Sequence, residues 1–320
     1  MNGRPFIIKI AALLLILEIW SAPVHTYGAD AASGPIAILL SDTEEAYSKP
    51  VASFIDEIQT PVQVFNLKGE IDNAPSMMAK IIALRPALIF ALGAKAAYTA
   101  KVWTTDRPQI PVVFAMVLNW QKYHLLDGQE NIAGIASEVA PGTQLVNMTI
   151  ASPQLKKVGV IYSKSYSSET IRQAKEAAAK LGLEVVDMPI SRPMEFRQAY
   201  KQIAERIDGF WILADPVVYT LENVDYLERR CTKDQIVCMG QSRNIAEMGV
   251  LLAVDPDIAN IGLQAASMAE SILLRHQLPK QIGVMPPLGT HLVLNAKTAD
   301  KIGLDLSSIA MDMANEIIGR

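Results

Sequence analysis

Polar and aromatic side chains follow the apolar runs of this chain, at the positions where a parallel sheet presents them along one edge. In an open α/β sheet, ligands bind in the crevice beyond the carboxyl ends of the strands. The positions predicted to contact a ligand are Ser41, Asp42, Thr43, Gly93, Ala94, Asn119, Trp120, Ser163, Tyr166, Asp215, Tyr219 and Arg243. The same loops also contain Lys95, Lys164, Ser165, Gln241 and Ser242.

The chemistry of these residues suits a small polar or zwitterionic solute. Asp215 can receive an ammonium group, and Arg243 can hold a carboxylate through a bidentate fork. Trp120 or Tyr219 can stack on a flat ligand. The backbone N–H groups that follow Gly93, at a predicted helix start, can face an anionic group.

Each candidate also has a plainer structural explanation. Ser41, Asp42 and Thr43 suit helix caps. Lys95, in the first turn of a predicted helix, is typical of a solvated side chain. Trp120 and Tyr166 are equally consistent with packing between lobes, so the sequence leaves both explanations open.

Sequence motifs of catalysis are missing. The chain contains no Gly-x-Ser-x-Gly elbow, no Walker loop, no Gly-x-Gly-x-x-Gly after the first apolar run and no His-Glu-x-x-His. Asp255 and Asp257 flank Pro256, where N-capping with Pro at the first helical position explains them. The histidines are scattered. We therefore predict no catalytic residue, no metal and no cofactor.

The start of the chain has the pattern of a secretory signal peptide. Arg4 and Lys9 precede the apolar run 10–17, and small residues lead to a cleavage site after Gly28. The run is interrupted by Glu18 and is shorter than the roughly 20 residues that span a bilayer. The mature protein should begin at or near Ala29 and act in the periplasm or elsewhere outside the cytoplasm. An uncleaved amphipathic anchor is the alternative, whereas no cysteine follows the run to carry a lipid.

Two consecutive series of strands and helices position the candidate residues. Strands are predicted over residues 35–40, 62–67, 87–92 and 111–117, and again over 157–162, 184–188, 209–214 and 236–239. Helices are predicted over residues 44–58, 74–84, 94–103, 141–150, 168–181, 194–206 and 219–230. Strands that are apolar throughout belong in parallel sheets covered on both faces. The prediction is an α/β protein with two doubly wound parallel-sheet lobes.

The last third of the chain predicts how the lobes are joined. A strand over 250–254 precedes a long helix over 256–274, a crossing at 279–287 and a last strand over 290–294. If this helix completes the first lobe, three crossings form a hinge. The expected division is a signal peptide at 1–28, an N-terminal lobe of 29–137 plus 256–287, and a C-terminal lobe of 138–255 plus 288–320.

Composition limits the class of partner. The 320 residues are 50% hydrophobic and 19% charged, which allows a large core and argues against disorder. A net charge of −4 offers no basic surface for nucleic acid. The two cysteines, Cys231 and Cys238, can form a disulfide between a helix end and the next strand in an exported protein, or remain two buried thiols.

Several segments of the mature chain match a family pattern. They are Leu88-Ile-Phe-Ala-Leu-Gly93, Ile110-Pro-Val-Val-Phe114, Asn131-Ile-Ala-Gly-Ile135 at the first crossing, Lys156-Lys-Val-Gly-Val-Ile-Tyr162, 249–255 with its following helix, and Leu292 to Leu304. Through these segments the chain resembles the ABC-transporter substrate-binding family of the type I periplasmic-binding-protein superfamily. The last segment is the most specific, with a strand, Asn295 and a helix before Gly303-Leu304. The chain departs from the family at Asn119-Trp120, where Asp-Pro is common, and at Ala214-Asp215-Pro216, where Thr-Asp-Asn is common.

The resemblance implies a two-lobed periplasmic solute-binding protein. Such a protein captures a small polar, amino-acid-like ligand by hinge closure and delivers it to an ABC permease, and it is expected to be a monomer that needs no covalent chemistry. One alternative is an extracytoplasmic sensing module that signals to a receptor or kinase. A doubly wound enzyme of the glycosyltransferase kind is the other.

Overall fold

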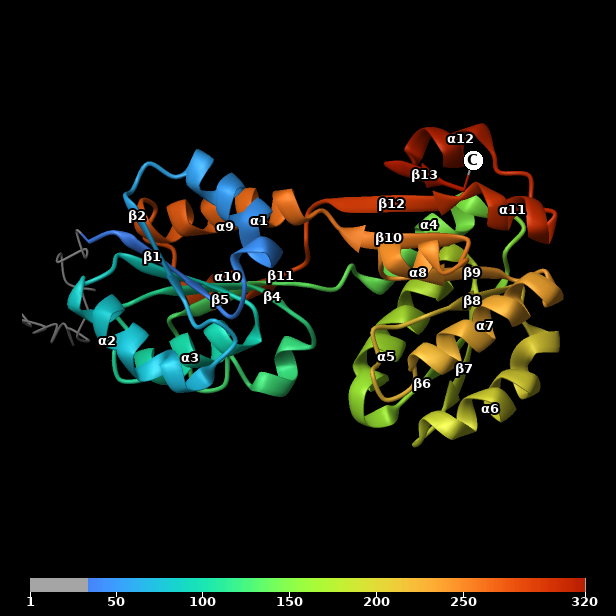
Figure 1. Cartoon of the computed structure of the whole chain (residues 1–320), viewed down its shortest axis with the longest axis horizontal. Helices are drawn as coiled ribbons and strands as arrows, with labels where there is room; N and C mark the ends of the chain where they lie inside the picture. Colours follow the sequence, from blue (N-terminus) through green and yellow to red (C-terminus); the bar gives the residue numbers. More distant parts are fainter. Residues whose placement is uncertain (1–33, 320) are drawn as a thin grey trace, which may run out of the picture. The chain divides into compact units, whose positions relative to one another are not determined.

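The computed structural model describes residues 34–319, which form two sheets of mostly parallel strands (Figure 1). The predicted signal peptide and its cleavage after Gly28 lie outside these residues. Within the described part of the chain, no helix is both long and apolar enough to cross a membrane.

The first lobe is the sheet in the order β11-β5-β4-β3-β1-β2 with its covering helices. All its pairings are parallel. Its strands are β1 (Ile36–Leu40), β2 (Val62–Asn66), β3 (Leu88–Leu92), β4 (Val112–Val117), β5 (Ile132–Ala136) and β11 (Val284–Met285). Because successive side chains of a strand point to opposite faces, its apolar strands need a cover on both sides.

Helices of the first lobe supply both covers. Ile36, Ile38 and Leu40 pack with residues of α1 (Glu44–Glu57) and α9 (Ile258–Leu273). Ala37 and Leu39 pack on the other face with α2 (Ala74–Ala83) and α3 (Ala94–Thr104). Figure 1 shows α1 beside α9, although the two helices lie far apart in the sequence. Helix α9 therefore packs on the first sheet, although it follows the strands of the second sheet in the chain.

The second lobe is the sheet in the order β13-β12-β10-β9-β8-β6-β7 with its helices. Only β10 and β12 pair antiparallel in this sheet within residues 34–319. Its strands are β6 (Lys157–Tyr162), β7 (Glu184–Pro189), β8 (Gly209–Trp211), β9 (Val237–Gly240), β10 (Leu252–Pro256), β12 (Thr290–Asn295) and β13 (Glu316–Ile318).

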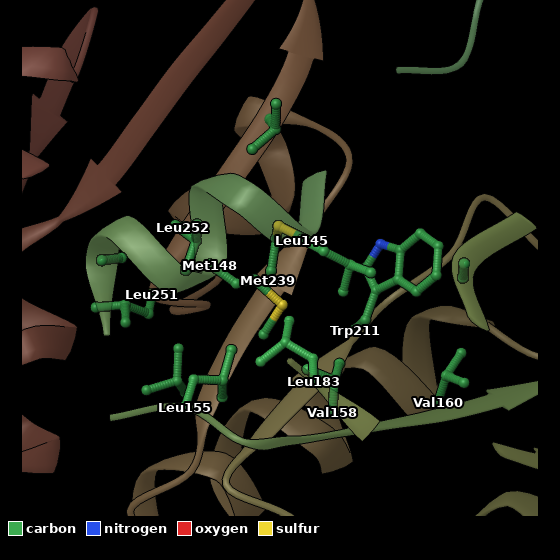
Figure 2. Packing of buried hydrophobic residues seen from close by; sticks show 14 of the residues in the cluster. Leu145, Met148, Leu155, Val158, Val160, Leu183, Trp211, Met239, Leu251 and Leu252 are labelled. Atoms are coloured by element: carbon green, nitrogen blue, oxygen red, sulfur yellow. The ribbon is translucent and has the colours of Figure 1, made fainter. Parts of the chain in front are cut away.

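Two apolar layers enclose this second sheet. One contains residues of α4 (Pro141–Ala151), α5 (Lys164–Leu181), α11 (Ala296–Ile302) and α12 (Ser308–Met313), and the other contains residues of α6 (Phe196–Ile203) and α7 (Leu221–Asp234). Figure 2 shows the first layer, in which Trp211 of β8 lies beside Leu145 of α4. Two short helices, α8 (Arg243–Glu247) and α10 (Pro279–Ile282), complete the main elements.

The chain passes between the two sheets three times within the described residues. It crosses at 137–140 between β5 and α4, at Asp257 between β10 and α9, and at 286–289 between β11 and β12. The predicted fold, two doubly wound lobes joined by a three-segment connection, is confirmed.

Several predicted bounds are wrong in detail. Helix α5 begins at Lys164 and not at Ser168, and β8 ends at Trp211 although apolar residues continue to Ala214. Pro256 ends β10 and is not the first helical residue of α9. Asp257 is the N-cap instead, because its carboxylate accepts hydrogen bonds from the N–H groups of Ala259 and Asn260.

The cysteines form a disulfide. Cys231 in α7 and Cys238 in β9 are bonded, with their Cα atoms 6.3 Å apart. Both side chains are buried. Of the two alternatives left by the sequence, the structure has the disulfide between the helix end and the following strand.

Candidate ligand-binding site

A cavity of about 360 Å³ lies at the carboxyl ends of β4 and β5 of the first lobe and of β8 and β9 of the second. Cavities of this size hold small organic ligands. The lining residues come from both lobes and from the first and third crossings. They are Asn119, Trp120, Gln121, Ala136, Glu138, Val139, Ala140, Pro141, Gln144, Tyr166, Ser167, Glu169, Thr170, Gln173, Leu213, Ala214, Gln241, Val284, Met285 and Pro286.

The end of β4 is bent to bring Asn119 and Trp120 to the cavity. The register between β4 and β5 shifts between Phe114 and Val117, and Met116 has a φ of 58°. Asn119 has a φ of 47°, in the left-handed region that Asn tolerates better than most residues. A bulge of this kind re-aims the side chains that follow it. Trp120 then packs against Phe114, with 6.2 Å between ring centroids.

Glu138 places a carboxylate on the cavity wall at the first crossing. Its Oε1 accepts a hydrogen bond from the backbone N–H of Asn119. Burial raises the pKa of the Glu138 carboxyl, and hydrogen bonds from the backbone of Asn119, Glu138 and Ser137 act in the opposite direction. Within residues 34–319 Glu138 forms no ion pair, so its charge is available to a ligand.

Gln144 forms a fixed polar point on the wall contributed by the second lobe. Its Oε1 accepts a hydrogen bond of 2.7 Å from the indole Nε1–H of Trp211. Its Nε2 donates to the backbone oxygen of Val139, also at 2.7 Å. The side chain is buried, and both bonds hold it in one orientation.

Tyr166, in the first turn of α5, connects the lobes beside the cavity. Its backbone oxygen accepts a hydrogen bond of 3.2 Å from Nδ2 of Asn119. The ammonium of Lys122 lies 3.8 Å from the centroid of the Tyr166 ring, a cation–π contact. Both contacts link a residue just after β4 to the second lobe.

Among the predicted ligand contacts, Asn119, Trp120 and Tyr166 line this cavity, together with Gln241 from the same set of loops. Ser41, Asp42, Thr43, Gly93 and Ala94 lie at the carboxyl ends of β1 and β3 but outside its lining. Ser41 has a structural role there, since its Oγ accepts a hydrogen bond of 2.8 Å from the N–H of Ala96 in α3.

Asp215 and Ser163 are hydrogen-bonded to each other and lie outside the cavity lining. The buried carboxylate of Asp215 accepts hydrogen bonds from the N–H and Oγ of Ser163, the Oγ of Ser167 and the N–H of Val217. Neither Asp215 nor Ser163 lines the cavity. This network joins the end of β6 to the loop after β8, so Asp215 is placed to organise α5 and not to face a ligand.

Tyr219 and Arg243 are also engaged elsewhere. The Tyr219 hydroxyl donates a hydrogen bond of 2.7 Å to the backbone oxygen of Ile161, and burial raises its pKa. Arg243 forms ion pairs with Glu247 and Glu316, which raise its pKa further. Neither residue lines the cavity, so the structure brings neither of the predicted charged contacts, Asp215 and Arg243, to it.

Sequence reasoning missed Glu138, Gln144 and the stretch 284–286 as cavity residues. A signal for Glu138 was present, since it closely follows the apolar segment 131–135, which forms most of β5. The sequence-based prediction assigns that segment to a crossing and not to a strand with its own carboxyl end. Gln144 lies inside helix α4, and the sequence does not show which face of that helix is turned toward the cavity.

Comparisons with known proteins agree with this architecture. The family model described as "ABC transporter substrate binding protein" matches residues 55–318. A tyrosine-binding protein of Clostridioides difficile (strain R20291) is 22% identical over 256 residues, which cover 77% of this chain and 71% of the relative.

Two solved structures show the same fold. One is the ligand-free, open structure of a substrate-binding protein with adhesive properties from Clostridium difficile (TM-score 0.72, 20% identity, 89% of this chain and 99% of that one). The other is an ABC domain in complex with L-Trp from Streptococcus pneumonia (TM-score 0.57, 18% identity, 88% and 100%). With its fold and nearly its whole described length matched, this chain belongs to the ABC transporter substrate-binding protein family.

Proposed function

We propose that this protein captures a small amino-acid-like solute in the cavity between its lobes and delivers it to an ABC permease. The observation that carries the proposal is the composition of the cavity wall, which takes residues from both lobes and from two crossings. A ligand that touches both lobes stabilises the closed arrangement, so closure needs no covalent step.

The chemistry of the wall supports an amino acid with a flat side chain as the first candidate. Trp120 and Tyr166 offer aromatic surfaces, Gln241 offers an amide, and Glu138 offers a charge. The relatives named for tyrosine and bound to L-Trp point to the same class.

The wider setting follows from the family. Substrate-binding proteins of ABC transporters act outside the cytoplasm, which fits export by the predicted signal peptide. We propose that the mature chain begins near Ala29, works as a monomer, and divides into an N-terminal lobe of 29–137 plus 256–287 and a C-terminal lobe of 138–255 plus 288–320. The partners are the ligand and the membrane permease, with no enzymatic step.

A thermal-shift screen of the mature protein tests the proposal. The panel contains amino acids, nucleosides, sugars and small organic acids, because a ligand at 100 times its Kd adds about 2.7 kcal/mol to the stability of the protein. We expect an amino acid to raise the unfolding midpoint. A panel in which no compound raises the midpoint contradicts the proposal.

A pair of variants then locates the binding site. Trp120→Ala removes an aromatic wall of the cavity and should weaken the best ligand by at least about tenfold in a calorimetric titration. Tyr98→Ala, on the exposed side of α3, is the control and should bind like the wild type. Equal affinity in all three proteins would place the ligand outside this cavity.

A further inference from the structure

We propose that Glu138 binds a cationic amine of the ligand and makes the cavity select amines over carboxylic acids. This inference rests on the proposed function and names the charge class of its ligand. It differs from the sequence-based expectation, which assigned the ammonium to Asp215.

The charges of the cavity wall carry the inference. Among the lining residues, Glu138 and Glu169 are carboxylates, and none is a lysine or arginine. Glu169 is neutralised by its ion pair with Arg172 and holds a further hydrogen bond from Gln173. Glu138 thus supplies an uncompensated negative charge to the wall of the cavity.

The position of Glu138 is fixed by the backbone. The N–H of Asn119 donates to its Oε1, and Asn119 is itself held by its side-chain bond to the oxygen of Tyr166. An ionised carboxylate has about four acceptor positions. The backbone donors of Asn119, Glu138 and Ser137 therefore leave a position for an N–H of an ammonium. The ammonium would bind a Glu138 carboxylate that is already held in place, so binding would not cost the entropy of ordering this side chain.

The surrounding cations do not compensate Glu138. The ammonium of Lys122 lies over the ring of Tyr166, and it is not part of the cavity lining. A ligand carboxylate without an amine would therefore meet a like charge in a partly desolvated site, which is unfavourable. A protonated amine at the same place would instead be attracted by the opposite charge of the Glu138 carboxylate.

Matched ligand triads test this selection by calorimetric titration of the full mature protein. Each triad contains an amino acid, its amine without the carboxylate, and its acid without the amine. The probes are L-tryptophan with tryptamine and indole-3-propionate, L-tyrosine with tyramine and 3-(4-hydroxyphenyl)propionate, and L-leucine with isopentylamine and 4-methylpentanoate. In a triad that binds, we expect the acid to bind at least about tenfold more weakly than the two amine-bearing compounds.

Glu138→Gln separates charge recognition from shape. It keeps the size and the acceptor oxygen, so the protein should fold, and the preference for amines should fall to less than about threefold. Glu205→Gln removes an exposed carboxylate on the amino-terminal side of β8, away from the cavity, and should retain the wild-type preference.

The outcomes distinguish this inference from the function on which it rests. An acid that binds as well as its amine, or an unchanged preference in Glu138→Gln, overturns the inference and leaves solute binding intact. Binding of a sugar or nucleoside with no triad member bound overturns both the inference and the amino-acid-like ligand class, and it leaves only the binding of a small solute. If neither the triads nor the wider panel binds, both the inference and the proposed function fail.

Discussion

Asp215 and Glu138 show that the role of a carboxylate depends on the donors around it. Asp215 is buried and its oxygens are occupied by donors from Ser163, Ser167 and Val217. Glu138 is bonded to backbone N–H groups and also faces the cavity. Ser163 and Asp215 are 52 residues apart, so the sequence alone does not reveal that they meet.

Removing the Asp215 carboxylate should destabilise the folded protein. Asp215→Ala leaves the buried hydroxyls of Ser163 and Ser167 without their acceptor, and we expect the free energy of unfolding to fall by about 3 kcal/mol. Urea titration followed by circular dichroism measures the change. Asp42→Ala is the control and should change stability by less than about 0.5 kcal/mol, since exposed Asp42 accepts within residues 34–319 only from the N–H of Thr43. Equal effects in the two variants would contradict the structural role of Asp215.

The pH dependence of binding should report Glu138. Burial raises its pKa above the ordinary value of 4.5. Because only the ionised form attracts an ammonium, affinity should be full above this raised pKa and fall as the pH drops through it, by at most about tenfold per pH unit. Tryptamine is the probe, since it has no carboxylate of its own.

Other groups at the cavity do not titrate in that range. Glu169 has its pKa lowered to about 2 by Arg172 and Gln173, and burial raises the pKa of the Tyr166 hydroxyl. Calorimetry between pH 7.5 and 4.5, with Glu138→Gln as the comparison, measures the effect. A pH profile shared by the wild type and this variant would assign the titration to another group.

At the scale of elements, continuous apolar runs predicted the sheets well. The strand predicted over 157–162 is β6 residue for residue, because every side chain after the exposed Lys157 is buried, whichever face of the sheet it is on. The prediction of a strand over 209–214 was too long, because buried residues need not be paired in a sheet. Ile212 and Leu213 are buried but lie beyond the end of β8. Short elements such as α8 and β11 were not predicted. They are too short to show a periodic pattern, and their formation depends on contacts with neighbouring strands.

The disulfide between α7 and β9 should contribute to the stability of the second lobe. Cys231 and Cys238 are separated by 7 in sequence. Closing a loop of this size lowers the entropy of the unfolded chain, which raises the free energy of unfolding by about 2 to 3 kcal/mol. The double change to Ala should lower the free energy of unfolding by this amount, as measured by urea titration.

Thiol labelling of the denatured, unreduced wild type should find no free thiol. Two labelled cysteines would contradict the bond.

At the scale of the whole molecule, the three crossings were predictable because strands and helices alternate in a regular order. The cavity was less predictable, since its wall depends on which loops face each other across the crossings. Asn119, Trp120 and Tyr166 were among the predicted contacts, whereas the loops after β1 and β3 do not line it. Position after a strand places a residue at the correct edge of its sheet, but it does not show which part of that edge meets the other lobe.

Ligand-driven closure can be measured with a pair of spin labels, one on each lobe. Val102→Cys on α3 and Leu221→Cys at the start of α7 are exposed sites, and the native cysteines are bonded to each other. With saturating L-tryptophan, or whichever triad amino acid binds most tightly, the distance distribution should shift to shorter values, because the cavity wall takes residues from both lobes.

Two controls make this prediction specific to movement between lobes. A pair within the first lobe, Val102→Cys with Ile71→Cys, should give the same distances with and without ligand. In the Glu138→Gln background, the same ligand concentration should produce a smaller shifted fraction, because a ligand moves an equilibrium only by its difference in affinity for the two states. If the pair across the lobes does not shift although calorimetry shows that the site is saturated, the protein binds its ligand without closing, and the crossings serve as rigid connections and not as a hinge.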